Sequence, residues 1–263
     1  MIKKQNKTIL IAIDIGNTSM SVGVFLGRRF VKKTRIPTVS KEQKIYTRLS
    51  RLLKPYICCD IKVIISSVVP CVTKNVKHIF TDKFKLRPII VGKHVKAPIK
   101  NLYKTPAQVG QDRLVNAFAC KQIYGSPAII IDFGTATTFD YVNKRGEYEG
   151  GIITPGVEIT INSLAENTAL LPKIKLKKPQ NLIGKDTSDS IRSGVLNGLA
   201  CMCDGLIEKI KKDRKSSPIV VATGGLARVF CHYSKHINKV DQDLTLKGLY
   251  LIFSKKSTLP LDI

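Results

Sequence analysis

The sequence predicts an α/β protein built from two similar lobes, and three observations support this prediction. Runs of β-branched and apolar residues separated by glycine turns give a three-stranded meander near the start of the chain and a second meander at about half its length. An aspartate lies at the end region of the first strand of each meander, Asp14 in the first and Asp132 in the second. After each meander, apolar residues at helical spacing alternate with short apolar runs. One pattern that occurs twice, half a chain apart, indicates an internal duplication.

The first half of the chain is predicted to form a meander followed by alternating helices and strands. Glycine turns separate the meander strands, apolar residues on one helical face mark the first helix, and Gly125 closes the last one. The expected strands are Thr8–Ile15, Ser19–Leu26, Phe30–Ile36, Lys62–Val69 and Pro88–Val91, and the expected helices are Ser40–Tyr56, Val72–Phe84 and Asp112–Tyr124.

The second half repeats this order. Its expected strands are Ala128–Asp132, Thr137–Val142, Glu147–Ile153 and Ile219–Ala222, and its expected helices are Pro155–Leu171, Ser188–Lys212 and one beyond Gly225. A three-stranded meander followed by alternating helices and strands is typical of the ribonuclease-H-like lobe found in actin-type folds. We therefore expect an N-terminal lobe over residues 1–125 and a C-terminal lobe over residues 126–263.

The composition indicates a soluble globular protein with a strongly basic surface. Of the 263 residues, 43% are hydrophobic and 24% are charged, which excludes a disordered chain. The formal net charge of +25 raises the question of a nucleic-acid partner. The densest lysine runs, within residues 173–178 and 209–215, contain no aromatic residues that could stack on bases. We therefore expect a solvated lysine-rich surface and no specific nucleic-acid partner, although the charge would attract a polyanion such as ATP.

The cysteines and apolar segments indicate a cytoplasmic protein with no membrane partner. The seven cysteines form no CxxC pair and the four histidines lack ligand spacing, so neither a disulfide framework nor a zinc site is expected. The apolar run Thr8–Ile13 is ended by Asp14 and is too short for the core of a signal peptide. No segment approaches the ~20 apolar residues of a membrane span.

Each meander contains a turn that could bind phosphate. In the segments Asp14-Ile15-Gly16-Asn17-Thr18 and Asp132-Phe133-Gly134-Thr135-Ala136, an acidic residue is followed by a glycine turn. Glycine lets backbone N–H groups approach phosphate oxygens, hydroxyls add donors, and a carboxylate can hold a cation or its water. The alternative is a pair of ordinary hairpins. Because the two turns occupy matching places in the duplicated halves, a phosphate site is favoured.

Asp112 is the candidate base, and it also has a structural alternative. It stands at the expected start of a helix, where aspartate is a favoured N-cap. A carboxylate beside Arg113 could instead accept the proton of an alcohol that attacks the terminal phosphate of a nucleotide. The residues alone favour the cap.

The ordered motifs of the chain resemble those of the type III pantothenate kinases. The motifs extend from residue 14 to residue 225, and their combination is specific although each is degenerate. They are Asp14-x-Gly16-Asn17-Thr18, Gly110-x-Asp112-Arg113, Asp132-Phe133-Gly134-Thr135-Ala136-Thr137-Thr138, Gly150-Gly151-Ile152-x-x-Pro155-Gly156, Gly184-Lys185-x-Thr187 and Thr223-Gly224-Gly225.

The resemblance implies an ATP-dependent kinase that phosphorylates the 4′-hydroxyl of pantothenate, the first step of coenzyme A biosynthesis. It implies a homodimer, Mg²⁺ with the nucleotide, and K⁺ or NH₄⁺ bound by Asp132. It also implies that Asp112 is the catalytic base. The ATP contacts implied are Asp14, Ile15, Gly16, Asn17, Thr18, Ser19, Met20, Ser21 and Thr135, and the pantothenate contacts are Tyr103, Gly110, Gln111, Asp112, Arg113 and Thr187.

Two other functions remain open at this point. Another small-molecule kinase or a phosphohydrolase of the same superfamily would keep the turns after Asp14 and Asp132 but would not need an alcohol pocket at Tyr103 and Thr187. A basic nucleic-acid-binding regulator is suggested only by the net charge, and its binding to DNA should fall steeply with salt.

Overall fold

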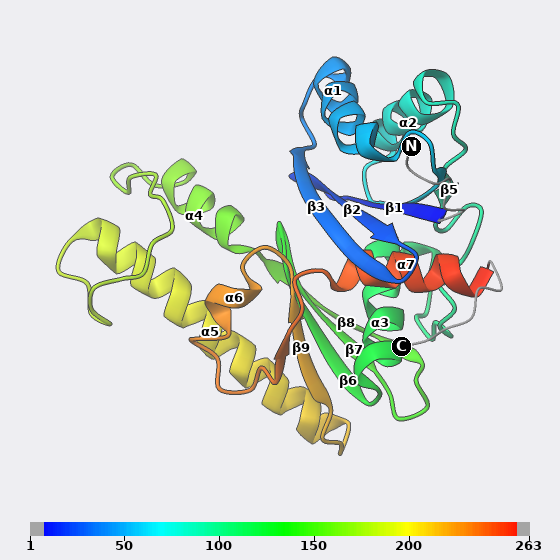
Figure 1. The fold of residues 1–263 in the computed structure, drawn as a ribbon. Helices are drawn as coiled ribbons and strands as arrows, with labels where there is room; N and C mark the ends of the chain where they lie inside the picture. Colours follow the sequence, from blue (N-terminus) through cyan, green and yellow to red (C-terminus); the bar gives the residue numbers. More distant parts are fainter. Residues whose placement is uncertain (1–7, 257–263) are drawn as a thin grey trace. The chain divides into compact units, whose positions relative to one another are not determined.

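The structure is a computed structural model that describes residues 8–256, and these residues form two compact units (Figure 1). Unit 1 contains residues 8–99, 104–119 and 244–256 of the described chain. Unit 2 contains residues 100–103 and 120–243. Each unit has a five-stranded mixed sheet with helices packed against it.

The sheet of unit 1 is a meander extended by two parallel strands. Its order is β3-β2-β1-β4-β5, in which β1, β2 and β3 pair antiparallel while β4 and β5 are added parallel to β1. The strands are β1 (Thr8–Ile15), β2 (Ser19–Leu26), β3 (Arg29–Pro37), β4 (Asp60–Ser67) and β5 (Ile89–Ile90), and the helices are α1 (Glu42–Leu53), α2 (Pro70–His78) and α7 (Leu244–Lys256). Helix α3 (Gln111–Tyr124) belongs to unit 1 up to Ala119 and to unit 2 from Cys120.

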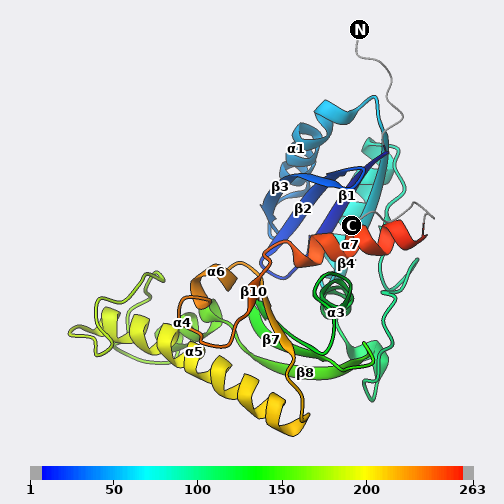
Figure 2. The ribbon, with the colours of Figure 1, turned by 60° about the horizontal axis from the view of Figure 1, so that its bottom comes forward.

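Strand β1 is buried on both of its faces. Side chains alternate along β1, so Ile11 and Ile13 face the core formed with α1 and α2, while Leu10 and Ala12 face the core formed with α7 and the first turns of α3. Figure 2 shows the strands of unit 1 between α1 on one side and α7 on the other. A strand that is covered on both faces reads as a continuous apolar run, and this is the pattern of Thr8–Ile15.

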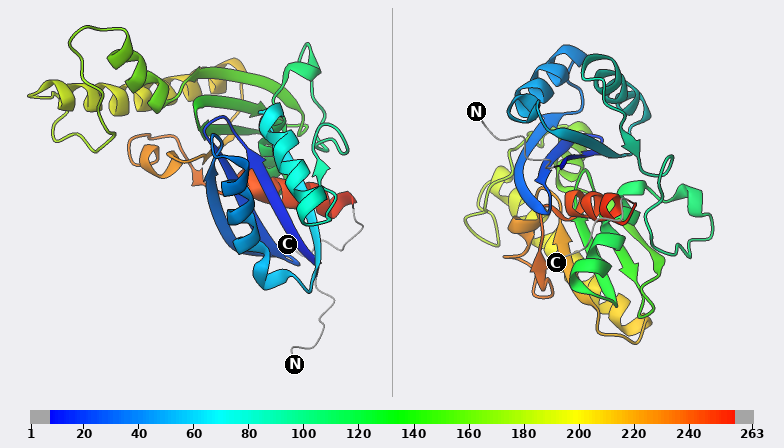
Figure 3. Two further views of the ribbon diagram at one scale, coloured as in Figure 1. Left: turned by 90° about the horizontal axis from the view of Figure 1, so that it is seen from above. Right: turned by 45° about the vertical axis from the view of Figure 1, so that its right-hand side comes forward.

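Unit 2 repeats the architecture. Its sheet order is β10-β9-β6-β7-β8. Read from β8, the order matches that of unit 1, with the meander β8-β7-β6 in the place of β3-β2-β1 and the parallel strands β9 and β10 in the place of β4 and β5. Helices α4 and α5 lie side by side, as Figure 3 shows, and contribute to a single core with β6, β7 and β9. The elements are β6 (Ala128–Phe133), β7 (Ala136–Val142), β8 (Tyr148–Pro155), α4 (Val157–Glu166), α5 (Thr187–Asp213), β9 (Ile219–Thr223), α6 (Ala227–Phe230) and β10 (Lys239–Val240). The predicted duplicated α/β fold is confirmed.

Strand boundaries agree with the predictions to within two residues, whereas some helices differ more. Helix α4 ends at Glu166 instead of Leu171, because the Asn167 side chain donates to Ser163 O (2.9 Å) and Pro172 disfavours helical geometry just before it. The helix expected up to Phe84 is α2 followed by a π-helical turn, Ile79–Lys83. The sequence analysis missed β10 and α7.

The composition of the two units differs from the predicted ranges 1–125 and 126–263. Helix α7 belongs to unit 1, since Leu246 and Leu249 are buried in the core that β1 and α3 share. Gly248 allows close contact between α7 and α3, because a Cβ there would lie 2.7 Å from Val115 Cγ1. Conversely, residues 100–103 belong to unit 2.

Among the described residues, no helix combines the length and apolarity needed to cross a bilayer. All seven cysteines are free thiols. The described residues contain no group of three or more His, Cys, Asp and Glu side chains arranged to hold a metal ion.

Candidate active site

The first glycine turn lies at the carboxyl edge of the unit 1 sheet. Asp14 is the penultimate residue of β1 and is paired with Ser21 in β2 and Ser66 in β4. In the turn, Gly16 N donates to Ser19 O (3.1 Å), and Thr38 Oγ1 donates to Gly16 O (2.7 Å). The turn is therefore held from both of its strands and from the end of β3.

The residues around this turn differ in what they can offer a nucleotide. Asn17 and Thr18 are exposed, and Ser19 and Ser21 are half-buried. Ile15 and Met20, which were expected among the ATP contacts, are fully buried in the core, so only their backbone groups could take part. Thr38, which the sequence analysis missed, fixes the turn through its hydroxyl and through its N–H, which donates to Thr18 O (3.1 Å).

Asp112 lies at the same edge of unit 1 as this turn. Val68 follows β4, and its N–H donates to Ile15 O at the end of β1 (3.1 Å). Gly110 packs on that residue, since a Cβ at Gly110 would lie 3.6 Å from Val68 Cγ1 and 2.5 Å from Asp112 Oδ1. The missing side chain of Gly110 therefore leaves room for the Asp112 carboxylate.

The environment of Asp112 suits a proton acceptor. Helix α3 begins at Gln111, so Asp112 is in its first turn and is not the capping residue that precedes it. Its Oδ1 accepts from Arg113 N (2.8 Å). Burial raises the pKa of the Asp112 carboxyl above its ordinary value of 3.8, while the backbone N–H and guanidinium of Arg113 act in the opposite direction. A carboxylate with a raised pKa is a stronger base than an exposed one.

Gln111 has a structural contact in unit 1. Gly92 has a φ of +85°, and a Cβ there would lie 2.7 Å from the Gln111 Cδ atom. The Gln111 side chain therefore packs on the backbone of Gly92.

In unit 2, three glycine motifs meet at one edge of the sheet. Strands β6, β8 and β9 are parallel to one another, so their carboxyl ends share this edge. A Cβ on Gly156, just after β8, would overlap the carbonyl oxygen of Thr135 in the second turn. A Cβ on Gly224, just after β9, would overlap Asp132 Oδ1 and would lie 2.7 Å from Phe133 O. Backbone from both motifs thus contacts the second turn directly.

The oxygen atoms at this edge fit a small cation. Asp132 Oδ1 and Phe133 O both lie against the α-carbon of Gly224, and carboxylate and carbonyl oxygens are the ligands that hard cations take. Thr223, the β9 residue paired with Asp132, is buried beside them. The residues that the structure brings together here are compatible with the cation expected at Asp132.

Tyr103 and Thr187 lie in different parts of unit 2. The Tyr103 ring packs on Gly150, whose φ is +137°; a Cβ there would lie 3.4 Å from the ring. Thr187 is exposed and begins α5, at the end of this helix that projects away from the sheet in Figure 1. Asp186 caps the helix by accepting from Asp189 N (2.8 Å). Among the described residues, no hydrogen bond or ion pair joins Thr187 to Tyr103.

Comparisons with known proteins identify the family of the chain. Residues 10–209 match the family model described as type III pantothenate kinase. A type III pantothenate kinase of Bacillus cytotoxicus is 38% identical over 256 residues, which cover 95% of this chain and 98% of that protein.

Two solved structures share the fold at low sequence identity. A Sinorhizobium meliloti protein described as a 2-dehydro-3-deoxygalactonokinase has a TM-score of 0.62 at 13% identity and covers 97% of this chain, with 99% of its own chain covered. A Campylobacter jejuni protein described as a Baf family transcriptional activator has a TM-score of 0.59 at 19% identity. The match covers 95% of this chain and 100% of that protein's chain. These similarities concern the fold alone, whereas the sequence matches establish the family. The chain belongs to the type III pantothenate kinases, which phosphorylate pantothenate with ATP in coenzyme A biosynthesis.

Proposed function

We propose that Asp112 is the base of pantothenate phosphorylation in this chain and that the glycine turns of the two units bind ATP. The observation that carries this proposal is the placement of Asp112, half-buried and with a raised pKa, at the sheet edge that also holds the turn after Asp14. The Asp112 carboxylate therefore lies at the same edge of the unit 1 sheet as the turn that we propose to bind phosphate. The buried environment favours transfer of a proton onto it.

The reaction follows from these roles. Asp112 takes the proton of the 4′-hydroxyl of pantothenate as that oxygen attacks the γ-phosphorus, and the bond from phosphorus to the departing ADP oxygen breaks. The ATP contacts are Asp14 to Ser21 and Thr135, through backbone N–H groups and exposed hydroxyls. Asp14 would hold a water of Mg²⁺, and Mg²⁺ neutralises charge on the phosphates when it is bound with ATP. The pantothenate contacts are Tyr103, the segment from Gly110 to Arg113, and Thr187.

A coupled assay of ADP release tests this reaction. We expect ADP to be released only when pantothenate is present with Mg-ATP. Release at the full rate without pantothenate would instead indicate a phosphohydrolase, and phosphorylation of a different alcohol in preference to pantothenate would indicate another small-molecule kinase.

Asp132 is proposed to hold K⁺ or NH₄⁺ near the nucleotide. A carboxylate close to incoming phosphates would repel them unless a cation stands between the two. We expect low turnover in buffer whose monovalent cation is a bulky tetraalkylammonium, and recovery when K⁺ or NH₄⁺ is added. Asp132→Ala should remove this recovery.

The matched control is Asp213→Ala, which removes an exposed carboxylate at the end of α5 that pairs with Arg214 (3.2 Å). This variant should keep the response to K⁺. Full activity without a small monovalent cation, or an unchanged response in Asp132→Ala, would contradict the role of Asp132.

A homodimer is also proposed, and exposed apolar side chains between α4 and α5 support it. Leu170, Leu182 and Ile183 are 90%, 74% and 84% exposed, and all three lie in the segment between α4 and α5. Exposed apolar side chains that cluster in one segment are typical of an interface. We expect a dimer in sedimentation velocity and a shift toward monomer in Leu182→Asp. Ile57→Asp, at a side chain that is 81% exposed in unit 1, is the control and should remain dimeric.

A further inference from the structure

Residues 100–103 are an inserted piece of unit 2, because the chain on either side of them belongs to unit 1. They lie alongside the start of β8, in parallel orientation. Tyr148 N donates to Lys100 O (2.8 Å), and Leu102 N donates to Tyr148 O (2.8 Å). The pairing is limited to the single bridge between Asn101 and Tyr148. Two backbone hydrogen bonds therefore determine the register of the segment.

This segment carries Tyr103, one of the proposed pantothenate contacts. Tyr103 N donates to Asn101 Oδ1 (3.0 Å), and the Tyr103 ring lies on the α-carbon of Gly150. The position of the ring is thus determined by where the segment sits on β8. Any contact that anchors the segment also places the ring.

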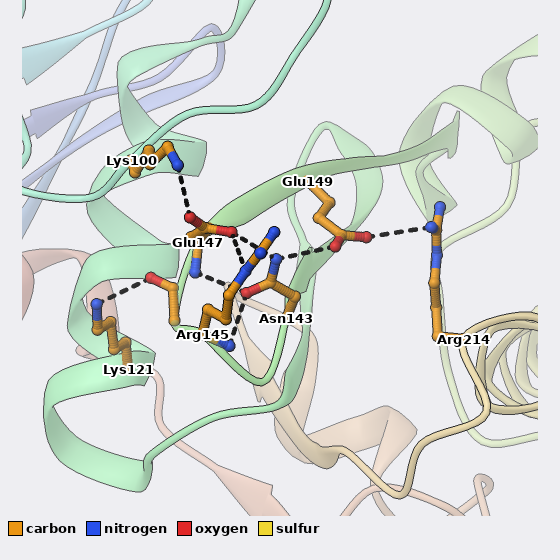
Figure 4. Close-up of polar contacts among 8 residues, drawn as sticks. Lys100, Lys121, Asn143, Arg145, Glu147, Glu149 and Arg214 are labelled. Carbon is orange, nitrogen blue, oxygen red and sulfur yellow. Dashed lines mark hydrogen bonds and ion pairs between the residues drawn. The ribbon is translucent and has the colours of Figure 1, made fainter.

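An ion pair also connects the segment to the turn between β7 and β8. Lys100 Nζ contacts Glu147 Oε1 at 2.8 Å, as Figure 4 shows. The two partners differ in exposure: the Glu147 side chain is 11% exposed and the Lys100 side chain 68%. The carboxylate is therefore the fixed partner, and the lysine is the side chain that reaches it.

Glu147 is fixed by the turn between β7 and β8. Its Oε2 accepts from Asn143 Nδ2 (3.0 Å) and Arg145 Nε (2.9 Å), while its N–H donates to Asn143 Oδ1 (3.0 Å) (Figure 4). The hydrogen bonds from Asn143 and then Lys100 lower the pKa of Glu147 to about 2. The carboxylate is therefore ionised over the whole pH range in which the enzyme would be assayed.

We infer that the Lys100–Glu147 ion pair positions Tyr103 for pantothenate. The inference rests on the proposed role of Tyr103 in the pantothenate pocket. Lys100 and Glu147 are positioning residues that act through the segment and do not contact the substrate. Ion pairs with an exposed partner add little to global stability, so the main effect of breaking this one is on the segment itself.

The test is Lys100→Met, which keeps the aliphatic stem and removes the cation. We expect the KM for pantothenate to rise about three- to tenfold, while kcat and the KM for ATP change less than about twofold. Amide hydrogen exchange at Leu102 and Tyr103 should become faster, since the segment is held less firmly. Glu147→Gln should give the same changes, and the double variant should add little to either. Lys100→Arg should restore the pantothenate KM.

Two control variants alter the same turn without touching the segment. Lys121 Nζ donates to Gly146 O (2.9 Å), and Arg214 pairs with Glu149 (3.2 Å), as Figure 4 shows. Lys121→Met and Arg214→Met should leave the pantothenate KM unchanged. An equal rise in KM in either control would overturn the inference, because the effect would then belong to the turn as a whole.

The remaining outcomes separate this inference from the proposed site. Unchanged KM and unchanged amide exchange in Lys100→Met would show that the ion pair does not anchor the segment. A second outcome combines two variants: amide exchange is faster in Lys100→Met, and the pantothenate KM is unchanged in Tyr103→Ala. It would show that the ion pair anchors the segment but that Tyr103 is not part of the pocket. That result would overturn both the positioning role and the assignment of Tyr103, while the activity of the family would stand.

Discussion

Asp112→Asn should retain the fold and the binding of ATP while losing most of the phosphoryl transfer. The amide has nearly the same size and can still accept from Arg113 N, so the start of α3 should form as before. It cannot take a proton, and removal of a general base typically lowers the rate by about 10²- to 10⁴-fold. Turnover at saturating substrates and ATP binding by calorimetry measure the two expectations separately.

Asp60→Asn is the control for this experiment. Asp60 begins β4, at the opposite end of that strand from Val68, and its exposed carboxylate pairs with Lys62 (3.0 Å). Its turnover should equal that of the wild type. If Asp112→Asn keeps more than roughly a third of the wild-type turnover, Asp112 has a structural role and the base lies elsewhere.

The pH dependence of kcat/KM tests the role of Asp112 as the base independently. The base must be deprotonated to act, so kcat/KM falls as the pH drops through its pKa. Because burial raises this pKa, the acid limb should lie above pH 3.8, the ordinary value for aspartate. The residual activity of Asp112→Asn should lack this limb.

Gly224→Ala should weaken ATP binding strongly. Gly224 has a φ of +89°, and the new Cβ would overlap Asp132 Oδ1 and crowd Phe133 O. The second turn would have to shift, and the proposed cation site with it. We expect the KM for ATP to rise by about tenfold or more and the free energy of unfolding to fall by about 1–3 kcal/mol. Steady-state kinetics and thermal unfolding measure these changes.

Gly125→Ala is the control that separates the effect of the close contact at Gly224 from the effect of backbone strain. Gly125 has a φ of +91°, almost the same as Gly224, but no atom lies within 4 Å of the position its Cβ would take. It should lose stability through strain and keep its KM for ATP. An equal rise in the ATP KM of both variants would show that the contact of Gly224 with Asp132 does not matter for the nucleotide.

Local patterns in the sequence were sufficient for the strands and turns. The meanders were predicted from β-branched runs and glycine turns, and their strands are confirmed to within two residues because hairpin pairing depends on residues close in the chain. The duplication followed from the matching places of Asp14 and Asp132, and the sheets share one strand order. The family was identified from motifs that are each degenerate but specific in their order.

The contacts between distant segments were decided by the tertiary structure alone. Helix α7 joins unit 1 because Leu246 and Leu249 are buried against β1, more than 230 residues earlier in the chain. Gly156 and Gly224 meet the second turn because parallel strands bring their carboxyl ends to one edge. The raised pKa of Asp112 depends on burial at such an edge. Spacing along the chain indicates which face of an element is apolar but not which distant segment will cover it, since that pairing arises only when segments far apart in the sequence pack together.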